Sequence, residues 1–136
     1  MKGHAMTINT HLGISEDLCG RVTDLQPGSC TLEFNPMAQM RADDQGLVHG
    51  GFIFGAADYA AMLAINDPHV VLAGAEVRFL KPTRVGERLI FKAETVTDHP
   101  RKPKVEVHAL DAACDEVFRG VFSCAILSRH ALDGAA

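Results

Sequence analysis

Two glycines and one aspartate form the pattern in this chain that points most directly to chemistry. Gly50 and Gly51 stand immediately before an apolar run, 52–65, in which Asp58 is the only charged residue. The first turn of a helix has backbone N–H groups without partners and carries partial positive charge. Because glycine has no side chain, a ligand can approach that backbone closely. The pair therefore predicts a cradle for a carbonyl oxygen that becomes an oxyanion, with a simple tight turn before the helix as the alternative.

The spacing between Gly51 and Asp58 adds a geometric condition. Seven helical residues span about 10 Å along the axis, which is too far for both groups to act on one carbonyl carbon. Two antiparallel copies of the chain would place Asp58 of one copy opposite Gly51 of the other, and symmetric dimers are the commonest oligomers. The alternative is a structural Asp58 with hydrogen bonds in the core, because a buried carboxylate is costly unless partnered or used.

Five further residues are candidates for contacting a substrate. His49 precedes the glycines and either binds the substrate or holds the loop, and Asp43 in the same loop could orient a water molecule. Phe52 belongs either to a pocket or to the core. Arg84 and Lys102 could contact phosphates, with a solvated surface as the alternative for both. They belong to two small basic groups, Lys81 with Arg84 and Arg101 with Lys102 and Lys104.

Composition and missing motifs exclude several other functions. A net charge of −4 gives no basic footprint for nucleic acid. There is no G-x-S-x-G elbow, Walker loop, Rossmann glycine pattern or paired metal-ligand spacing, so no metal and no cofactor are expected. The four cysteines form no C-x-x-C pair and are expected to be reduced core or strand residues of a cytoplasmic protein. They are Cys19, Cys30, Cys114 and Cys124.

The surrounding pattern predicts one domain in which a curved sheet wraps around one long helix. The apolar run is too long for a strand, so it predicts a buried helix; it is short for a bilayer and carries an acid, so no membrane span is expected. Period-two alternation predicts strands at 20–26, 30–35, 70–81, 88–94, 105–109 and 118–126. Short turns predict that the last four are antiparallel neighbours. The expected divisions are an arm (1–18), the domain (19–129) and a tail (130–136), with residues 1–5 partly an expression remnant.

Two stretches resemble hotdog-fold acyl-CoA thioesterases of the phenylacetate-pathway (PaaI-like) branch. The first is His49-Gly50-Gly51 followed by Phe54, Ala57-Asp58 and Ala60; the second, 75–89, is similar to the strand-turn-strand after the helix. The resemblance covers about 20–128 and implies an α+β hotdog fold with a curved antiparallel sheet of five to six strands. It also implies a cytoplasmic homodimer, assembled as a tetramer, that hydrolyses acyl-CoA thioesters, with CoA present only as part of the substrate.

The resemblance also implies roles for individual residues. Gly51, with Gly50, would polarise the thioester carbonyl, and Asp58 of the partner subunit would act as general base or nucleophile. His49 would shape the loop. Many relatives have Asn where this chain has Asp43, and the Ser or Thr that some members place after the helix is not evident at 73–75.

Other functions of the same fold remain as alternatives. The 75–89 stretch also resembles the ligand-binding domain of FapR repressors, which sense malonyl-CoA without hydrolysing it. In those regulators the helix acid is replaced, whereas this chain has Asp58, and the segment before the first strand is expected to be too short for a DNA-binding module. A hydratase or dehydratase needs a catalytic His paired with an acid or placed on the helix, and His49 precedes the helix.

Overall fold

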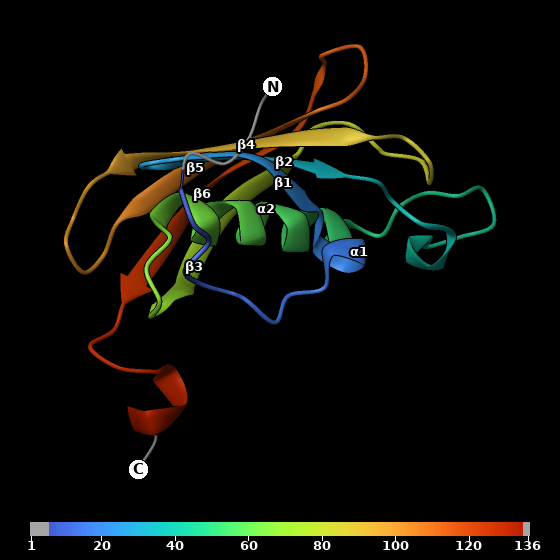
Figure 1. Cartoon of the computed structure of the whole chain (residues 1–136). Coiled ribbons are helices and arrows are strands. Elements are labelled where there is room, and N and C mark those ends of the chain that lie inside the picture. The colour runs from blue at the N-terminus through green and yellow to red at the C-terminus, as the bar shows by residue number, and fades with distance from the viewer. Residues whose placement is uncertain (1–5, 135–136) are drawn as a thin grey trace.

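The computed structural model describes residues 6–134 as a six-stranded antiparallel sheet that curves around one long helix, α2 (Gly50–Ile65) (Figure 1). The strands are β1 (Arg21–Gln26), β2 (Ser29–Phe34), β3 (Val70–Phe79), β4 (Leu89–Thr97), β5 (Lys104–Leu110) and β6 (Glu116–Ile126). Short helical segments complete the chain: α1 (Glu16–Cys19), η1 (Ala38–Met40) and η2 (Ala131–Gly134). The predicted α+β hotdog architecture is confirmed. The expected remnant at 1–5 lies outside the described residues.

The order of strands in the sheet is β1-β2-β4-β5-β6-β3. The prediction that the last four strands are neighbours in sequence order was wrong for β3 and β4, because β3 pairs with β6 and β4 pairs with β2 and β5. The 80–88 connection is not a tight turn. It lies against the loop before α2, where the Val48 amide donates to the Thr83 carbonyl at 2.9 Å, and the Gly86 amide reaches the Pro36 carbonyl at 3.0 Å. These contacts lead the chain across to the β2 side.

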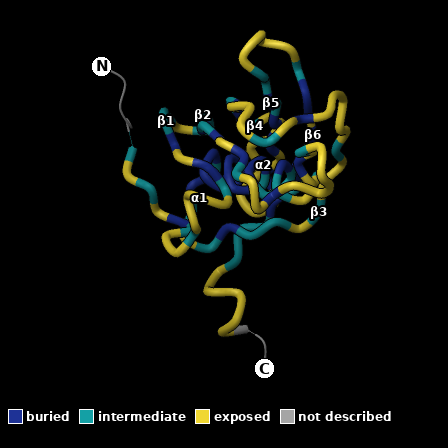
Figure 2. The backbone as a smooth tube through the Cα atoms, turned by 90° about the vertical axis from the view of Figure 1, so that its right-hand side faces the viewer, coloured by how far each residue is buried: buried dark blue, intermediate teal, exposed yellow. Residues whose placement is uncertain are grey.

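The core lies between α2 and the concave face of the sheet (Figure 2). The sheet contributes large side chains from its inward positions, and the helix contributes five alanines, which let its backbone approach the sheet closely, beside larger residues such as Met62 and Leu63. The largest fully buried strand residues are Phe34, Phe91, Phe118, Phe122, Leu25, Leu32 and Leu89, and the buried helix alanines are Ala56, Ala57, Ala60, Ala61 and Ala64. This packing fixes the rotation of α2, and therefore the direction in which its remaining side chains point.

The N-terminal arm is tied to the C-terminal end of α2. Ser15 caps α1 by accepting a hydrogen bond from the Leu18 amide, and two acids follow it in the first turn. Asn66 ends α2 in the left-handed conformation, and its side chain accepts from the Asn9 amide and donates to the Thr7 carbonyl, both at 2.8 Å. The arm is thus held beside α2.

The cysteines divide into two groups. Cys30 and Cys124 are buried strand residues, as predicted. The prediction was wrong for the other two: Cys19 is half-buried at the end of α1, and Cys114 is exposed in the β5–β6 turn with φ 65°. All four are free thiols.

Candidate functional site

The N-terminal end of α2 presents two backbone amides without partners in the described chain. The amides of Gly50 and Gly51 meet no acceptor among residues 6–134, whereas the Phe52 amide bonds to the His49 carbonyl at 3.1 Å. The His49 amide donates to the Met40 carbonyl at 2.9 Å, which fixes the chain entering the helix. Both free donors lie at the positive end of the helix dipole. They are the groups that an oxyanion cradle requires.

Aromatic rings stand close to both glycines. A Cβ on Gly50 would lie 3.2 Å from the Phe79 ring, and a Cβ on Gly51 would lie 3.2 Å from the His49 ring. Phe79 was not among the predicted site residues, because its place in the alternating strand 70–81 predicts a buried side chain. It is instead 55% exposed at the end of β3. Phe79 comes close to the glycines only because β3 is an edge strand of the sheet. Alternation within a strand does not indicate whether that strand lies at an edge.

Asp58 is the one carboxylate on α2, and it has no hydrogen-bond partner for its buried oxygen. Oδ1 is buried without a donor among the described residues. Burial raises the pKa of this carboxyl group from 3.8 to about 6, because the charged form loses hydration. Two thiols lie near enough to respond: burial raises the pKa of Cys19 and of Cys124, and the Asp58 charge raises both further. Asp58 therefore lies between α1 and β6.

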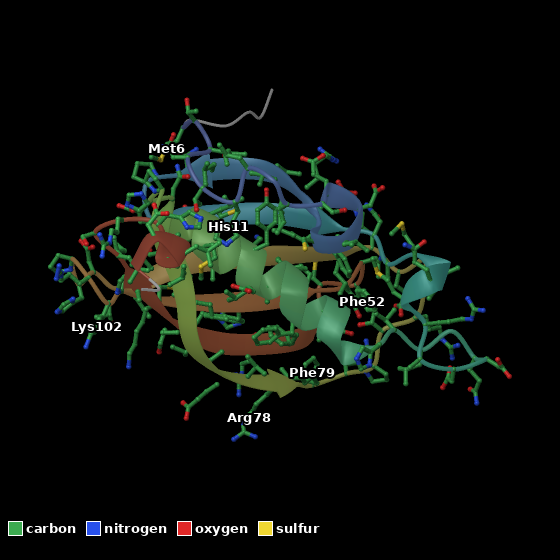
Figure 3. The ribbon with its side chains drawn as sticks, turned by 90° about the horizontal axis from the view of Figure 1, so that it is seen from below. Met6, His11, Phe52, Arg78, Phe79 and Lys102 are labelled. Carbon is green, nitrogen blue, oxygen red and sulfur yellow. The ribbon has the colours of Figure 1, made fainter. Side chains whose placement is uncertain are left out.

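Gly51, Gly55 and Asp58 occupy one stripe of α2 at positions i, i+4 and i+7. The expectation of a helix buried all round was wrong along this stripe: Gly51 is exposed, and Gly55 and Asp58 are half-buried. A Cβ on Gly55 would meet no atom within 4 Å. Seen from the side opposite the sheet, no strand crosses this face of the helix (Figure 3). The open stripe joins the free amides and the acid, with the separation of about 10 Å that the sequence predicted.

Asp43 holds the loop that leads into the helix. Its Oδ1 accepts from the amides of Gln45 and Leu47, at 3.0 and 3.2 Å. The Gly46 amide bonds to the Asp43 carbonyl at 3.4 Å, and the Leu47 carbonyl accepts from the Ala42 amide at 2.6 Å. The structure thus gives Asp43 a loop-forming role, as an Asx turn does. Its contact with a substrate remains a prediction.

The other predicted binding residues lie at different ends of the helix. Phe52 is half-buried, with its ring edge-on to His49 at a centroid distance of 6.1 Å. Arg84 lies next to Leu47 through an isolated bridge, near the glycines. Lys102 lies beyond the opposite end of α2 (Figure 3). A single chain therefore does not bring Arg84 and Lys102 together.

Lys81 is not a free cation of the Arg84 group. Its ammonium group pairs with Asp111 at 2.9 Å and with Asp115 at 3.1 Å, which links β3 to the β5–β6 turn. Lys81 is therefore no longer a candidate for binding phosphate together with Arg84.

Comparison with known proteins shows a family similarity over the part of the chain that carries the candidate site. A family model described as the thioesterase superfamily matches residues 45–98, a span that includes both glycines and Asp58. An uncharacterized protein from Pyrococcus horikoshii has 44% sequence identity and a TM-score of 0.92, over 94% of this chain and 98% of that chain. Residues 45–98 thus match the thioesterase superfamily, and the described chain has the hotdog fold.

Two curated proteins are similar to most of this chain but have other names. It is 50% identical over 117 residues to methylthioribose-1-phosphate isomerase of Aquifex aeolicus, which is 86% of this chain and 25% of that protein. It is 30% identical over 116 residues to the transcription factor FapR of Caldanaerobacter subterraneus, which is 85% of this chain and 56% of that protein. The chain thus spans a quarter of the first protein and about half of the second.

Solved structures connect the fold to the PaaI proteins. A mutant of the phenylacetic acid degradation protein PaaI from Thermus thermophilus, in which Asp replaces Asn, is 25% identical with a TM-score of 0.74, over 82% of this chain and 96% of that chain. A Streptococcus mutans protein solved with acetyl-CoA has the same fold at 19% identity and a TM-score of 0.78, over 89% of this chain and 99% of that chain. The likeness to PaaI supports the PaaI-like branch.

Two further features of residues 6–134 concern other classes of function. No group of three or more His, Cys, Asp or Glu side chains is placed to hold a metal ion. None of the helices in this part of the chain is long and apolar enough to span a membrane.

Proposed function

We propose that this chain is an acyl-CoA thioesterase that works as two antiparallel copies. The observation that supports this most directly is the open stripe of α2, where two free amides and a buried, unpartnered carboxylate share one face. A second copy related by a two-fold axis would place Asp58 of the partner subunit opposite Gly51, on the two sides of one thioester.

The edge strand β3 supports the two-copy arrangement. It is ten residues long and pairs only with β6 among the described strands, so its other edge is free. Val70 is its one buried residue, and Phe79 is exposed at its end. A long free edge with apolar side chains is a site for pairing with another chain. Pairing of β3 with its symmetry mate would extend the sheet and place the two helices on one side. Assembly of two such dimers into a tetramer remains part of this proposal.

In the proposed reaction, the thioester carbonyl oxygen accepts hydrogen bonds from the Gly51 amide and, with it, the Gly50 amide. The carboxylate of Asp58 in the partner subunit takes a proton from water, and the water oxygen bonds to the carbonyl carbon. The negative charge moves to the carbonyl oxygen, where the amides stabilise it. The tetrahedral intermediate then breaks its C–S bond, and Asp58 returns the proton to the CoA thiolate. The products are a free acid and CoA.

A nucleophilic Asp58 is the second form of this mechanism. The carboxylate would attack the carbonyl carbon directly, release CoA and leave an acyl anhydride that water hydrolyses. A single turnover in ¹⁸O-labelled water detects a nucleophilic Asp58 whose anhydride is opened at the Asp58 carbonyl. Label in the acid product without label in the protein is expected from a general base, and also from an anhydride that water opens at its acyl carbonyl. Unlabelled product, with one ¹⁸O retained in the Asp58 peptide, indicates a nucleophile.

The test of the proposed function is hydrolysis measured across short, medium, long and aromatic acyl-CoAs. The wild type is expected to turn over at least one class, and Asp58→Asn to lose about 10²–10⁴-fold in kcat. Full activity in Asp58→Asn would refute the proposed role of the acid.

The FapR relatives favour a second candidate, an acyl-CoA binding domain without turnover. The FapR of Caldanaerobacter subterraneus is 30% identical over 85% of this chain, so the fold alone does not separate a sensor from an enzyme. Tight acyl-CoA binding by the wild type, with no CoA release above the uncatalysed rate, would support the sensor and exclude the enzyme. The isomerase name provides no such candidate, because the match spans only a quarter of that protein.

A further inference from the structure

A groove with an entirely cationic set of charged side chains lies away from the glycines and Asp58. It has a volume of about 480 Å³ and forms where the β4–β5 loop meets the segment after β6. Arg101, Lys102 and Arg129 line it, and no Asp or Glu does. In a chain with a net charge of −4, this is a local concentration of positive charge. None of the ion pairs among residues 6–134 uses these three side chains.

The groove is held in shape by hydrogen bonds on its loop side. His99 Nδ1 accepts from the amides of Arg101 and Lys102, at 3.1 and 3.0 Å. The Arg101 carbonyl accepts from the Ile126 amide at 2.8 Å, which fastens the loop to the end of β6. The two cations are therefore presented by a fixed backbone. Their exposed side chains remain available to a ligand.

The chemistry of the lining indicates which ligand fits. Ile126 and Leu127 give the groove apolar surface that a flat heteroaromatic base can cover, while the cations surround it. Arg side chains bind phosphate oxygens in pairs, and Lys supplies a point charge. The volume lies in the range of small-molecule sites. These features together fit a phosphorylated purine nucleoside.

We propose that this groove binds the phosphorylated adenosine end of CoA, an inference that rests on the proposed function. The groove lies beyond the C-terminal end of α2, and Lys102 is at the opposite end of the helix from Phe52 (Figure 3). Asp58 is seven residues from Ile65, about 10 Å from that end of its own helix. The groove of the subunit that supplies Gly51 lies at least 14 residues, about 21 Å, from the same thioester. The phosphates are therefore held by the subunit that supplies Asp58.

Substrate truncation tests the site. The double variant Arg101→Gln/Arg129→Gln is expected to raise KM for acyl-CoA about 10–100-fold, with kcat within about twofold. For the matching acyl-pantetheine, which lacks both nucleotide and phosphates, KM is expected to be unchanged. Lys104→Gln is the matched control, because Lys104 is an exposed cation nearby that does not line the groove. An equal effect on both substrates, or no effect on acyl-CoA, would overturn the proposal.

Calorimetry tests the groove without turnover. Wild-type chain titrated with adenosine 3′,5′-bisphosphate is expected to bind it, and the double variant to bind at least about tenfold more weakly. If no acyl-CoA is hydrolysed but this binding holds, the proposed enzyme fails and the groove stands. Equal binding by wild type and double variant, or equal affinity for inorganic phosphate alone, overturns the nucleotide assignment.

Mixed dimers test which subunit supplies the groove. Asp58→Asn chains are co-assembled with Arg101→Gln/Arg129→Gln chains and purified through two different tags. If the groove and Asp58 act from the same subunit, each site in the mixed dimer carries a defect, and no activity with wild-type KM appears. Activity with wild-type KM would mean that the subunit supplying Gly51 holds the phosphates, and would refute the same-subunit assignment.

Discussion

The pH dependence of hydrolysis is the sharpest test of Asp58, because its environment shifts the titration into an accessible range. Burial raises the pKa of this carboxyl group to about 6. The ionised form required of a base is then about one-tenth populated at pH 5 and about nine-tenths at pH 7. Because this pKa belongs to the free enzyme, we expect kcat/KM to rise about tenfold between these values. An Asp58 with the ordinary pKa of 3.8 would already be about nine-tenths ionised at pH 5, and kcat/KM would hardly change.

The assay is kcat/KM at acyl-CoA concentrations well below KM from pH 4.5 to 8, measured by chromatography of released CoA at constant ionic strength. Chromatography avoids thiol reagents, whose own reaction depends on pH. Asp58→Asn is the control, and it is expected to lose the acid limb together with most of the activity. A wild-type profile that is flat from pH 5 to 7, or an acid limb that persists in Asp58→Asn, would refute the assignment of that limb to Asp58.

Three further predictions concern the same helix and its loop. Because burial disfavours the Asp58 anion, its protonated form stabilises the fold fully below pH 3.8, and this stability is lost as pH rises through about 6. After discounting for partial exposure, Asp58→Asn should raise the free energy of unfolding by about 1–2 kcal/mol and the Tm by about 3–8 °C at pH 8. Calorimetric scans at pH 3.5 should show no gain. Gly51→Ala places a Cβ 3.2 Å from the His49 ring at the proposed carbonyl site. The value of kcat/KM should fall at least about tenfold, while Tm changes little. Unchanged kinetics would argue against close approach of the substrate carbonyl to Gly51. Asp43→Ala loses two hydrogen bonds to loop amides and should cost about 1 kcal/mol in urea unfolding, whereas Asp43→Asn keeps an acceptor at Oδ1 and should cost much less; equal losses would contradict the Asx-turn role.

The sequence predicted the elements well because each depends on local pattern. Alternation located the six strands, and the long apolar run located α2. The strand order could not be obtained in the same way. Pairing of β3 with β6 depends on where the 80–88 connection docks, through contacts such as that between Val48 and Thr83. Neither residue carries a signal for that contact in its type or spacing.

The site was predicted in part for the same reason. Gly51 and Asp58 share one helix, so their separation follows from helix geometry alone. Phe79 reaches Gly50 only because β3 lies at the sheet edge. The groove joins Arg101 to Arg129 across two connections, and no local pattern relates residues so far apart. Contacts between distant segments are what the sequence left undetermined.

The choice between enzyme and sensor depends on the stability that the fold loses by burying the Asp58 carboxylate. The thioesterase family model matches residues 45–98, and a FapR relative aligns over 116 residues of this chain, so similarity does not separate the two functions. The buried Asp58 oxygen has no donor in the described chain, and its burial opposes the charged form. A domain that only binds a thioester gains nothing from an acid that lowers its stability at neutral pH, and an Asn at this place would avoid the cost of a buried charge. Buried groups that destabilise a fold and lack a partner that offsets the loss are typical of catalytic and binding sites. Asp58 is such a group, on the face that carries the free amides of Gly50 and Gly51, and this favours hydrolysis over sensing.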